Sequence, residues 1–329
     1  MGFGYWDDDT YRAAHTYRAA RGQSDFSYTD DLRALPRSQW RVDPGLDPHG
    51  VAYRESRDSA DHPDSLPVVV LFDVTGSMGT IPRIMQQKLG KLHGLLQRKG
   101  YAADPQILFG AIGDADTDMV PLQVGQFEAD NAMDDQLRTV FLEGGGGGQK
   151  SESYELAAYF LARHTATDAW DKRGKKGYVF IVGDELNKPR LAARHVRAVI
   201  GDDVAEDIDV ASIYRELQRR WNVYFVLPGS SYYYDDTEIA DHWRGLLGER
   251  FLCLDDPAAV CELIALTIGV EEDSVELGAG LADLIDVGSP NEAASVRKAL
   301  TRVAADRGTV STTALPADLD GDDDVVTAT

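Results

Sequence analysis

PVVVLFDV, residues 67–74, is a continuous apolar run of strand length with an aspartate at its end. A strand that is apolar along its whole length is typical of a parallel sheet that is buried on both faces. In the residues that follow, TIPRIMQQKLGKLHGLLQRKG (80–100), apolar side chains recur at helical spacing, and Gly100 marks the end. The stretch therefore predicts a buried strand followed by a helix.

The same alternation of strand and helix continues along the chain. Five further runs are candidate strands: QILFGAIGD (106–114), PLQVGQF (121–127), YVFIVGD (178–184), WNVYFVLPG (221–229) and RFLCLD (250–255). Candidate helices are NAMDDQLRTVFLE (131–143), SYELAAYFLARH (153–164), RLAARHVRAVI (190–200), IDVASIYRELQRR (208–220), TEIADHWRGLL (237–247) and PAAVCELIALTIGV (257–270). Strands separated by such helices predict an α/β fold, a doubly wound, mostly parallel six-stranded sheet with helices on both faces.

Composition suggests one domain with polar ends. Residues 1–66 are rich in Asp, Arg, Ser, Pro and Tyr, and we expect a polar N-terminal arm before a domain over 67–270. The motif TYRAA occurs twice in the arm, at 10–14 and 16–20, either as a helix that presents Tyr11 and Tyr17 to a partner or as a local duplication. Residues 271–329 predict one more amphipathic helix (292–308) and a disordered acidic tail.

The charge balance restricts the class of partner. The 329 residues include 33 basic and 55 acidic side chains, a net charge of −22, which repels a nucleic-acid backbone or an anionic membrane surface. The sequence has neither a secretory signal at its start nor an apolar stretch of the ~20 residues needed to span a bilayer. With only Cys253 and Cys261 as cysteines, we expect a cytoplasmic protein without disulfides.

Polar side chains gather where the predicted strands end. The first strand ends DVTGSM, which places Asp73, Thr75 and Ser77 at alternate positions of a short turn. The strand YVFIVGD delivers Asp184 and then Glu185, and QILFGAIGD delivers Asp114. In an open α/β sheet these ends share one edge, where ligands bind. Carboxylate and hydroxyl oxygens at such an edge are ligands for a small hard cation.

The motif DVTGSM after an apolar strand resembles the D-x-[ST]-x-S sequence of the von Willebrand factor A (VWA) family. The resemblance assigns Asp73, Thr75, Ser77 and the later Asp184 to a metal-ion-dependent adhesion site (MIDAS) that holds Mg²⁺ or Mn²⁺. The family's remaining ligand, a threonine in a glycine-preceded loop, falls in EGGGGGQKSE (143–152), where Gln149, Ser151 and Glu152 are the alternatives. Asp114 either lies just outside the ligands of the ion or caps a loop.

The resemblance also implies a function. A partner's Asp or Glu completes the coordination of the ion, so the chain is expected to be a bacterial, intracellular interaction module and not an enzyme. Relatives of this kind often act with AAA-type ATPases or in multi-protein assemblies, which makes such a partner the expectation here.

Two alternatives remain open. Residues Gly144 to Ser151 differ at one position from the phosphate-binding motif G-x-x-x-x-G-K-[ST], and with Asp184 and Glu185 they indicate a nucleotide hydrolase. The other alternative is a structural adaptor with an incidental metal site. The tyrosines of SSYYYDD (230–236) either form part of a recognition surface or pack within a loop.

Overall fold

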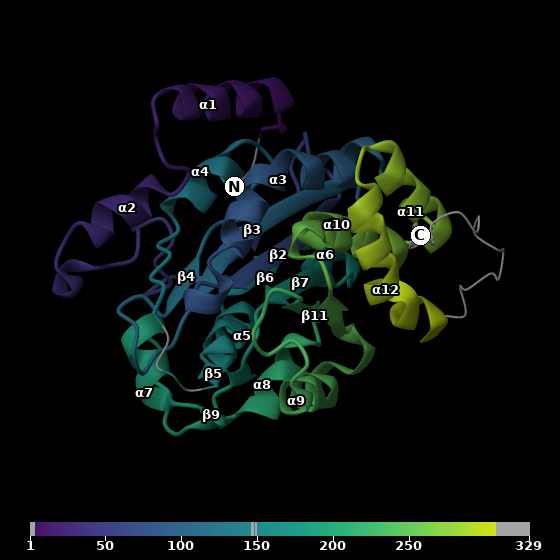
Figure 1. Cartoon of the computed structure of the whole chain (residues 1–329). Helices are drawn as coiled ribbons and strands as arrows, with labels where there is room; N and C mark the ends of the chain where they lie inside the picture. Colours follow the sequence, from purple (N-terminus) through teal and green to yellow (C-terminus); the bar gives the residue numbers. More distant parts are fainter. Residues whose placement is uncertain (1–3, 146–147, 149, 307–329) are drawn as a thin grey trace, which may run out of the picture.

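The computed structural model describes residues 4–145, 148 and 150–306, and a six-stranded sheet lies at its centre. In order across the sheet the strands are β12 (Phe251–Leu254), β11 (Trp221–Pro228), β7 (Gly177–Val182), β2 (Ser65–Asp73), β3 (Asp104–Ile112) and β4 (Leu122–Val124). Neighbours are parallel except β3 and β4, which are antiparallel. All six predicted runs therefore belong to one mostly parallel sheet, and the mixed α/β class is confirmed (Figure 1).

The central strand β2 explains why its sequence is apolar throughout. All nine of its residues are buried. Because side chains alternate along a strand, Val68, Val70 and Phe72 belong to one hydrophobic cluster, and Val69 and Leu71 belong to a second. Both faces of the strand are thus covered, which leaves no position for an exposed polar side chain.

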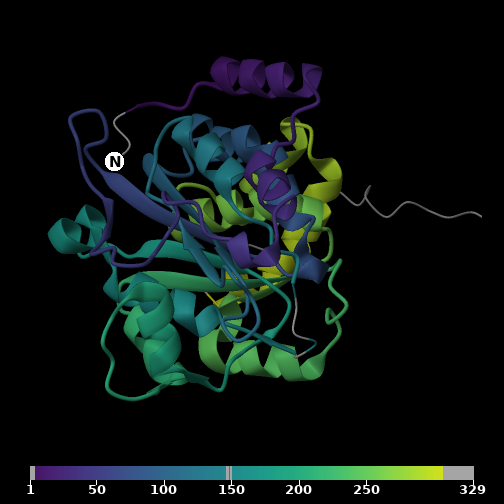
Figure 2. The same ribbon diagram turned by 90° about the vertical axis from the view of Figure 1, so that its left-hand side faces the viewer.

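Helices lie on both faces of the sheet (Figures 1 and 2). The first cluster includes residues of α3 (Ile81–His93), α4 (Ala132–Thr139), α10 (Val260–Glu271), α11 (Leu277–Asp286) and α12 (Pro290–Asp306). The second includes residues of α5 (Tyr154–Arg163), α8 (Val210–Leu217), α9 (Thr237–Leu247) and the π-helical turn Val196–Ile200 that follows α7 (Ala193–His195). Helix α6 (Asp168–Arg173) follows β6, and α1 (Asp8–Ala20) and α2 (Ser27–Arg33) belong to the N-terminal region. With these three, the described residues contain twelve α-helices.

Three two-stranded ladders lie outside the main sheet. They pair β1 (Arg54–Ser56) with β6 (Thr165–Thr167), β5 (Ser151–Glu152) with β8 (Leu186–Asn187), and β9 (Arg190–Leu191) with β10 (Ile208–Asp209). The ladders shorten two predicted helices, because residues 190–191 and 208–209 are strand instead of helix. The β5 and β8 ladder carries the end of the glycine-rich loop to the residues after β7.

The N-terminal region packs on the domain through two helices. Helix α1 (Asp8–Ala20) carries both TYRAA copies, and α2 (Ser27–Arg33) precedes a 3₁₀ turn, Arg37–Gln39. The Tyr11 side chain is buried and its hydroxyl donates to the Gln86 carbonyl at 2.5 Å, whereas Tyr17 is 54% exposed. Phe26 and Leu46 are buried in the first cluster. One TYRAA tyrosine therefore serves the core, and residues 4–66 share a hydrophobic cluster with the sheet.

The predicted helix over 131–143 is wrong in its last turn. Helix α4 ends at Thr139, and residues 140–142 are extended and buried. The Gln123 amide bonds both backbone groups of Phe141, donating to its carbonyl and accepting from its N–H, each at 2.8 Å. These side-chain bonds replace the bonds that another helical turn would make.

The C-terminal part adds two helices, of which α12 was predicted and α11 was not. Cys261 is buried and Cys253 half-buried, and they form no disulfide. Among the described helices, none combines the length and apolar character that crossing a bilayer requires. The acidic tail, with DLDGDDD (318–324), lies outside the described residues.

Candidate functional site

The turn after β2 holds the Asp73 carboxylate in a fixed orientation. Asp73 is fully buried, and its Oδ1 accepts hydrogen bonds from the Thr75 backbone N–H at 2.7 Å and from the Thr75 hydroxyl at 2.6 Å. Residues Gly76–Met78 form a 3₁₀ turn that leads toward α3. The backbone of Ser77 lies in this turn, but its side chain is not among the described ones. The spacing D-x-T thus places a hydroxyl directly on the carboxylate.

Tyr154, the first residue of α5, is a third donor to Asp73. Its hydroxyl donates to Oδ2 of Asp73 at 2.7 Å, and burial together with Asp73 raises the pKa of Tyr154 well above its usual value. Gly183 makes room for it, since a Cβ there would lie 2.4 Å from the tyrosine hydroxyl oxygen. Sequence reasoning did not identify Tyr154, and its place beside a ligand candidate depends on long-range packing that no local motif indicates.

Asp184 follows β7 and lies beside Asp73. It is fully buried, and its Oδ2 accepts a hydrogen bond of 2.9 Å from the hydroxyl of Ser231, in the loop after β11. Burial and then the neighbouring Asp184 raise the pKa of Asp73 to about 7. The two aspartates expected to share one site therefore interact strongly, as like charges in a medium of low polarity do.

The glycine-rich loop contacts the Asp73 turn through its backbone. The Gly144 N–H donates to the Val74 carbonyl at 3.1 Å, and the Gly76 N–H donates to the Gly145 carbonyl at 3.0 Å. A Cβ on Gly145 would lie 2.4 Å from Oδ1 of Asp118, so a side chain there requires Asp118 to move. Gly144 has a φ of 68°, in the left-handed region that favours glycine.

Glu152 is the residue of the loop that reaches the carboxylates. It is 1% exposed, its Oε2 has no hydrogen-bond partner among the described residues, and burial followed by Asp73 and Glu185 raises its pKa to about 10. Ser151 is half-buried in the same two-residue strand, and Gln149 lies outside the described residues. Glu152 is the only acid among the three alternatives for the family's threonine, and its carboxylate interacts electrostatically with that of Asp73.

Glu185 is a further carboxylate of this cleft. Burial, Asp73 and Asp184 raise its pKa to about 8, and its Oε2 has no hydrogen-bond partner in the part of the chain that the structure describes. Its backbone carbonyl accepts from the indole N–H of Trp243 at 2.9 Å, which fixes the chain after β7 to α9. Four side chains, Asp73, Glu152, Asp184 and Glu185, thus form what we call the carboxylate cleft.

Asp114, at the end of β3, has a different counter-charge. The ammonium group of Lys188 lies 2.8 Å from its Oδ1 and 3.6 Å from Oδ2 of Asp116. Lys188 is only 7% exposed, and although burial lowers its pKa, Asp114 raises it above the usual value. Asp114 is therefore paired with a buried lysine that sequence reasoning missed.

The cleft has the composition of a cation site. All four carboxylates are at most 9% exposed, and burial, followed by the neighbouring acids, raises the pKa values of Asp73, Glu152 and Glu185. Within the described residues, no group of three or more His, Cys, Asp or Glu side chains is arranged to hold a metal ion. The residues fit a divalent cation if hydroxyl oxygens of the Asp73 turn join the carboxylates.

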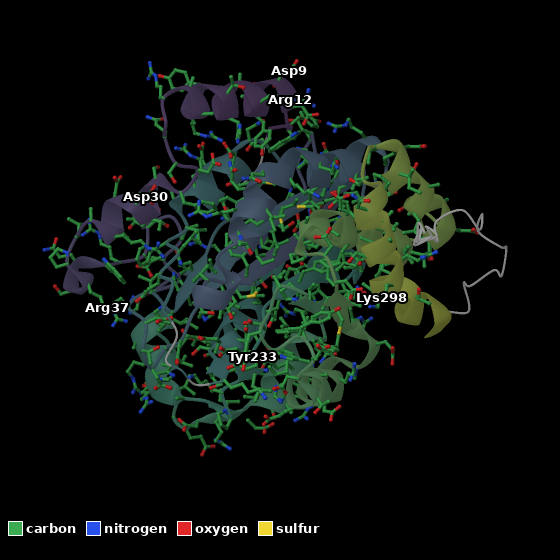
Figure 3. All side chains as sticks on the ribbon, in the orientation of Figure 1. Asp9, Arg12, Asp30, Arg37, Tyr233 and Lys298 are labelled. Carbon is green, nitrogen blue, oxygen red and sulfur yellow. The ribbon has the colours of Figure 1, made fainter. Side chains whose placement is uncertain are left out.

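Lys150, which the nucleotide-hydrolase alternative needs on a phosphate, is held elsewhere. Its ammonium group lies 2.5 Å from Oδ2 of Asp236 and 2.8 Å from Oε2 of Glu238, at the start of α9. It also lies 5.7 Å from the centre of the Tyr233 ring. Figure 3 shows Tyr233 on the side of α5 and α9. In this arrangement the lysine joins the glycine-rich loop to α9.

The tyrosine loop after β11 is mixed in character. Tyr232 is 88% exposed, whereas Tyr233 and Tyr234 are half-buried against the second hydrophobic cluster. The Tyr234 hydroxyl donates to Asp255. The loop therefore contains both of the roles that the sequence left open, a packed pair and one exposed ring.

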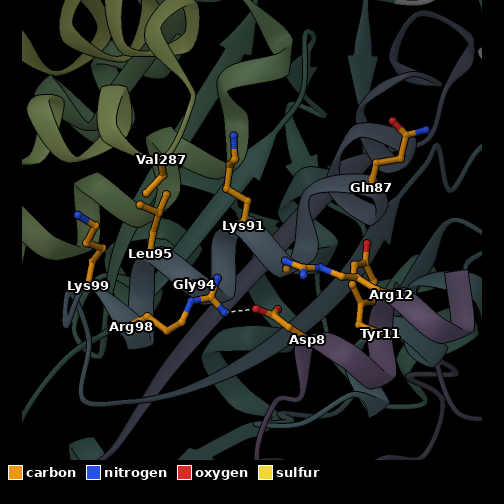
Figure 4. Close-up of a pocket in the computed structure, with 11 residues that line it drawn as sticks. Asp8, Tyr11, Arg12, Gln87, Lys91, Gly94, Leu95, Arg98, Lys99 and Val287 are labelled. Carbon is orange, nitrogen blue, oxygen red and sulfur yellow. Dashed lines mark hydrogen bonds and ion pairs between the residues drawn. The ribbon is translucent and has the colours of Figure 1, made fainter. Parts of the chain in front are cut away.

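A pocket of about 490 Å³ lies apart from the cleft, between α1, α3 and the turn after α11 (Figure 4). Four cations line it: Arg12, Lys91, Arg98 and Lys99. Three of them pair with acids, Arg98 with Asp8, Lys99 with Asp283 and Lys91 with Glu262. The pairs connect the N-terminal helix and the C-terminal helices to α3.

Comparisons with known proteins give distant structural likenesses. The sequence matches no family profile, and no curated protein matches it. The open conformation of the pilus adhesin SpaC from Lactobacillus rhamnosus GG is similar at 9% identity and a TM-score of 0.46, over 65% of this chain and 31% of that chain. Proximal thread matrix protein 1 from the mussel byssus is similar at 11% identity and a TM-score of 0.40, over 62% of this chain and 47% of that chain. The chain therefore spans less than half of the length of these solved structures.

Proposed function

We propose that the chain is a VWA-type module with a doubly wound, Rossmann-like sheet, whose carboxylate cleft holds Mg²⁺ or Mn²⁺ and binds a carboxylate of a protein partner. The observation that carries the proposal is the burial of Asp73 and Asp184 at the ends of adjacent strands, with Glu152 near enough to raise its own pKa through Asp73. The raised pKa values of Asp73 and Glu152 favour the binding of a positive charge at this position.

The ligand roles follow from the side chains present. Asp73 and Asp184 would hold the ion directly or through water, and the hydroxyls of Thr75 and Ser77 would supply neutral oxygens. When bound, the ion supplies an open coordination position for an external carboxylate. Tyr154 and Ser231 keep the two aspartates oriented. Glu152 adds a negative charge where the family has a threonine, which weakens the attraction of the ion for a partner carboxylate.

The partner in this proposal is a protein that offers an Asp or Glu, such as an AAA-type ATPase in a bacterial cytoplasmic assembly. No covalent bond is made or broken. The net charge of −22 makes nucleic acid and anionic membranes poor partners. Because Lys150 forms ion pairs with Asp236 and Glu238, a nucleotide hydrolase is the weaker alternative.

Cation binding tests the proposal directly. Titration of the chain with Mn²⁺ in a calorimeter should give one site, and Mg²⁺ should raise the melting temperature. Asp73→Asn and Asp184→Asn should each weaken Mn²⁺ binding at least tenfold. Asp241→Asn on α9, where the side chain is 81% exposed, is the matched control and should bind as the parent does.

The partner is tested by affinity capture from native lysate with and without a chelator. A protein that is retained by the parent, lost with chelator and lost with Asp73→Asn supports the proposal. Unchanged Mn²⁺ binding in Asp73→Asn would mean that the ion binds elsewhere and would end it.

A further inference from the structure

The entry to the glycine-rich loop is a buried extended segment that has no strand as its partner. Residues 140–142 are buried, and their backbone lies outside the strands of the described residues. Buried N–H and C=O groups need hydrogen bonds, and here side chains supply them. Gln123 of β4 bonds both groups of Phe141.

Helix α2 supplies the remaining bonds. The Thr29 hydroxyl donates to the Val140 carbonyl at 3.0 Å and accepts from the Leu142 N–H at 2.9 Å. The Arg33 guanidinium donates to the Leu142 carbonyl at 2.7 Å and reaches the Glu143 carbonyl at 3.4 Å. One helix of the N-terminal region therefore bonds both ends of the segment that leads into the glycines.

Glu143 extends this connection to the loop after β3. Its side chain is 2% exposed and accepts from the backbone N–H groups of Met119 and Val120, at 3.0 Å each for Oε2. Arg37, labelled at the end of the N-terminal helices in Figure 3, donates to Oε1 of Glu143 at 3.3 Å and to the Thr117 carbonyl at 2.6 Å. The N-terminal region thus contacts two loops at the C-terminal ends of the parallel strands: the loop after β3 and the entry to the glycine-rich loop.

The next two residues complete the path to the cleft. Gly144 and Gly145 exchange backbone hydrogen bonds with Val74 and Gly76, on either side of Thr75. A displacement of segment 140–143 would therefore move the turn that orients Asp73.

We propose that Thr29 and Arg33 are positioning residues: through segment 140–143 they set the conformation of Gly144, Gly145 and the Asp73 turn, so that the N-terminal region controls the geometry of the carboxylate cleft. The consequence for cation affinity rests on the proposed function. The conformational control does not, because it is carried by contacts between described residues.

Hydrogen exchange of the metal-free chain tests the control. In Thr29→Val, which keeps the shape of the side chain and removes the hydroxyl, amides of 140–145 and 74–78 should exchange at least tenfold faster. Amides of β11, at the other side of the sheet, should stay within twofold of the parent. Thr29→Ser restores the hydroxyl and should restore slow exchange. Asp31→Ala, on the exposed face of the same helix, is the control and should leave exchange unchanged.

Two results would overturn the inference. One is unchanged exchange in 140–145 and 74–78 in both Thr29→Val and Arg33→Ala. The other is an equal increase in β11, which would show that α2 contributes only to global stability. Because these measurements contain no metal, they decide the inference even if the parent binds no cation. With Mn²⁺ present, Thr29→Val should weaken binding three- to tenfold and Asp31→Ala should not.

Discussion

The hydroxyl of Tyr154 donates a hydrogen bond of 2.7 Å to Oδ2 of Asp73, and both side chains are fully buried. The bond links the start of α5 to the end of β2 and holds the carboxylate from the side opposite Thr75. It follows that the start of α5 cannot shift without changing the surroundings of Asp73. The end of β2 and the start of α5 together therefore determine the geometry of the carboxylate cleft.

Tyr154→Phe should lower the free energy of unfolding. The change leaves one oxygen of a buried carboxylate without its donor, which costs about 1–3 kcal/mol. Urea denaturation at pH 8 measures the difference. Tyr232→Phe, which alters an 88% exposed ring, should stay within about 0.5 kcal/mol of the parent. Equal stability of the parent and Tyr154→Phe would contradict this account of the bond.

Stability of the metal-free chain should fall as pH rises from 7 to 9. The folded-state pKa values of Glu185 and Glu152 are raised to about 8 and about 10, so the folded chain retains protons that the unfolded chain has already released. Stability falls with pH wherever the folded state holds more protons. Burial lowers the pKa values of His93 and His242, so these two side chains are neutral in the folded chain throughout this window.

Glu152→Gln is the variant that checks this slope. It removes the titrating group with the largest rise in pKa in the cleft and keeps its shape. Denaturation in the presence of a chelator should show a shallower decline with pH and higher stability at pH 9 than in the parent. A parent profile that is flat or rising between pH 7 and 9 would refute the assignment.

Gly183→Ala should destabilise the chain. The added Cβ would lie 2.4 Å from the hydroxyl oxygen and 2.9 Å from ring carbons of the buried Tyr154. Overpacking of this kind costs about 1–3 kcal/mol. Gly245→Ala is the matched control, since nothing lies within 4 Å of its added Cβ in α9. In a helix this change should raise stability by about 0.5–1 kcal/mol, so the two variants should differ in sign by thermal or urea denaturation.

Arg18→Met tests the attachment of α1. The Arg18 guanidinium lies 2.8 Å from Oδ2 of Asp134, and each side chain is 6% exposed. Removing the arginine leaves a buried charge with only the Gln86 amide as a described donor, which costs about 3–5 kcal/mol. The double change Arg18→Met with Asp134→Leu should recover most of the loss. A double variant as unstable as Arg18→Met alone would show that the pair is not the cause.

The sheet was predictable because its information is local. Each of the six strands is an apolar run of its own, as the buried pattern of β2 illustrates. Helix α1 was only one of two alternatives for the TYRAA repeats and α2 was not predicted, since α1 buries little more than Tyr11 and Arg18 on one side. A buried arginine gives no apolar periodicity, and its partner Asp134 lies more than a hundred residues away.

The site divides in the same way. Asp73, Thr75 and Asp184 were predicted, because a strand end and a short motif determine where they lie. The position of Glu152 near Asp73 was not, because it depends on a two-residue ladder between β5 and β8. Lys188 and Tyr154 contact the predicted acids only through the packing of distant elements.

The short antiparallel strand β4 is an edge strand of the sheet, and the N-terminal region covers this edge. The outward N–H of Val124 donates to the carbonyl of Leu46 at 2.8 Å, and Leu46 is buried. An unprotected edge strand is a template on which another chain can add a strand and begin to aggregate. Removing residues 1–64, which leaves β2 intact, would expose this edge as well as apolar surface, so the shortened domain should self-associate. The N-terminal region is therefore expected to protect the domain from aggregation, and it needs to be kept when the protein is produced for study.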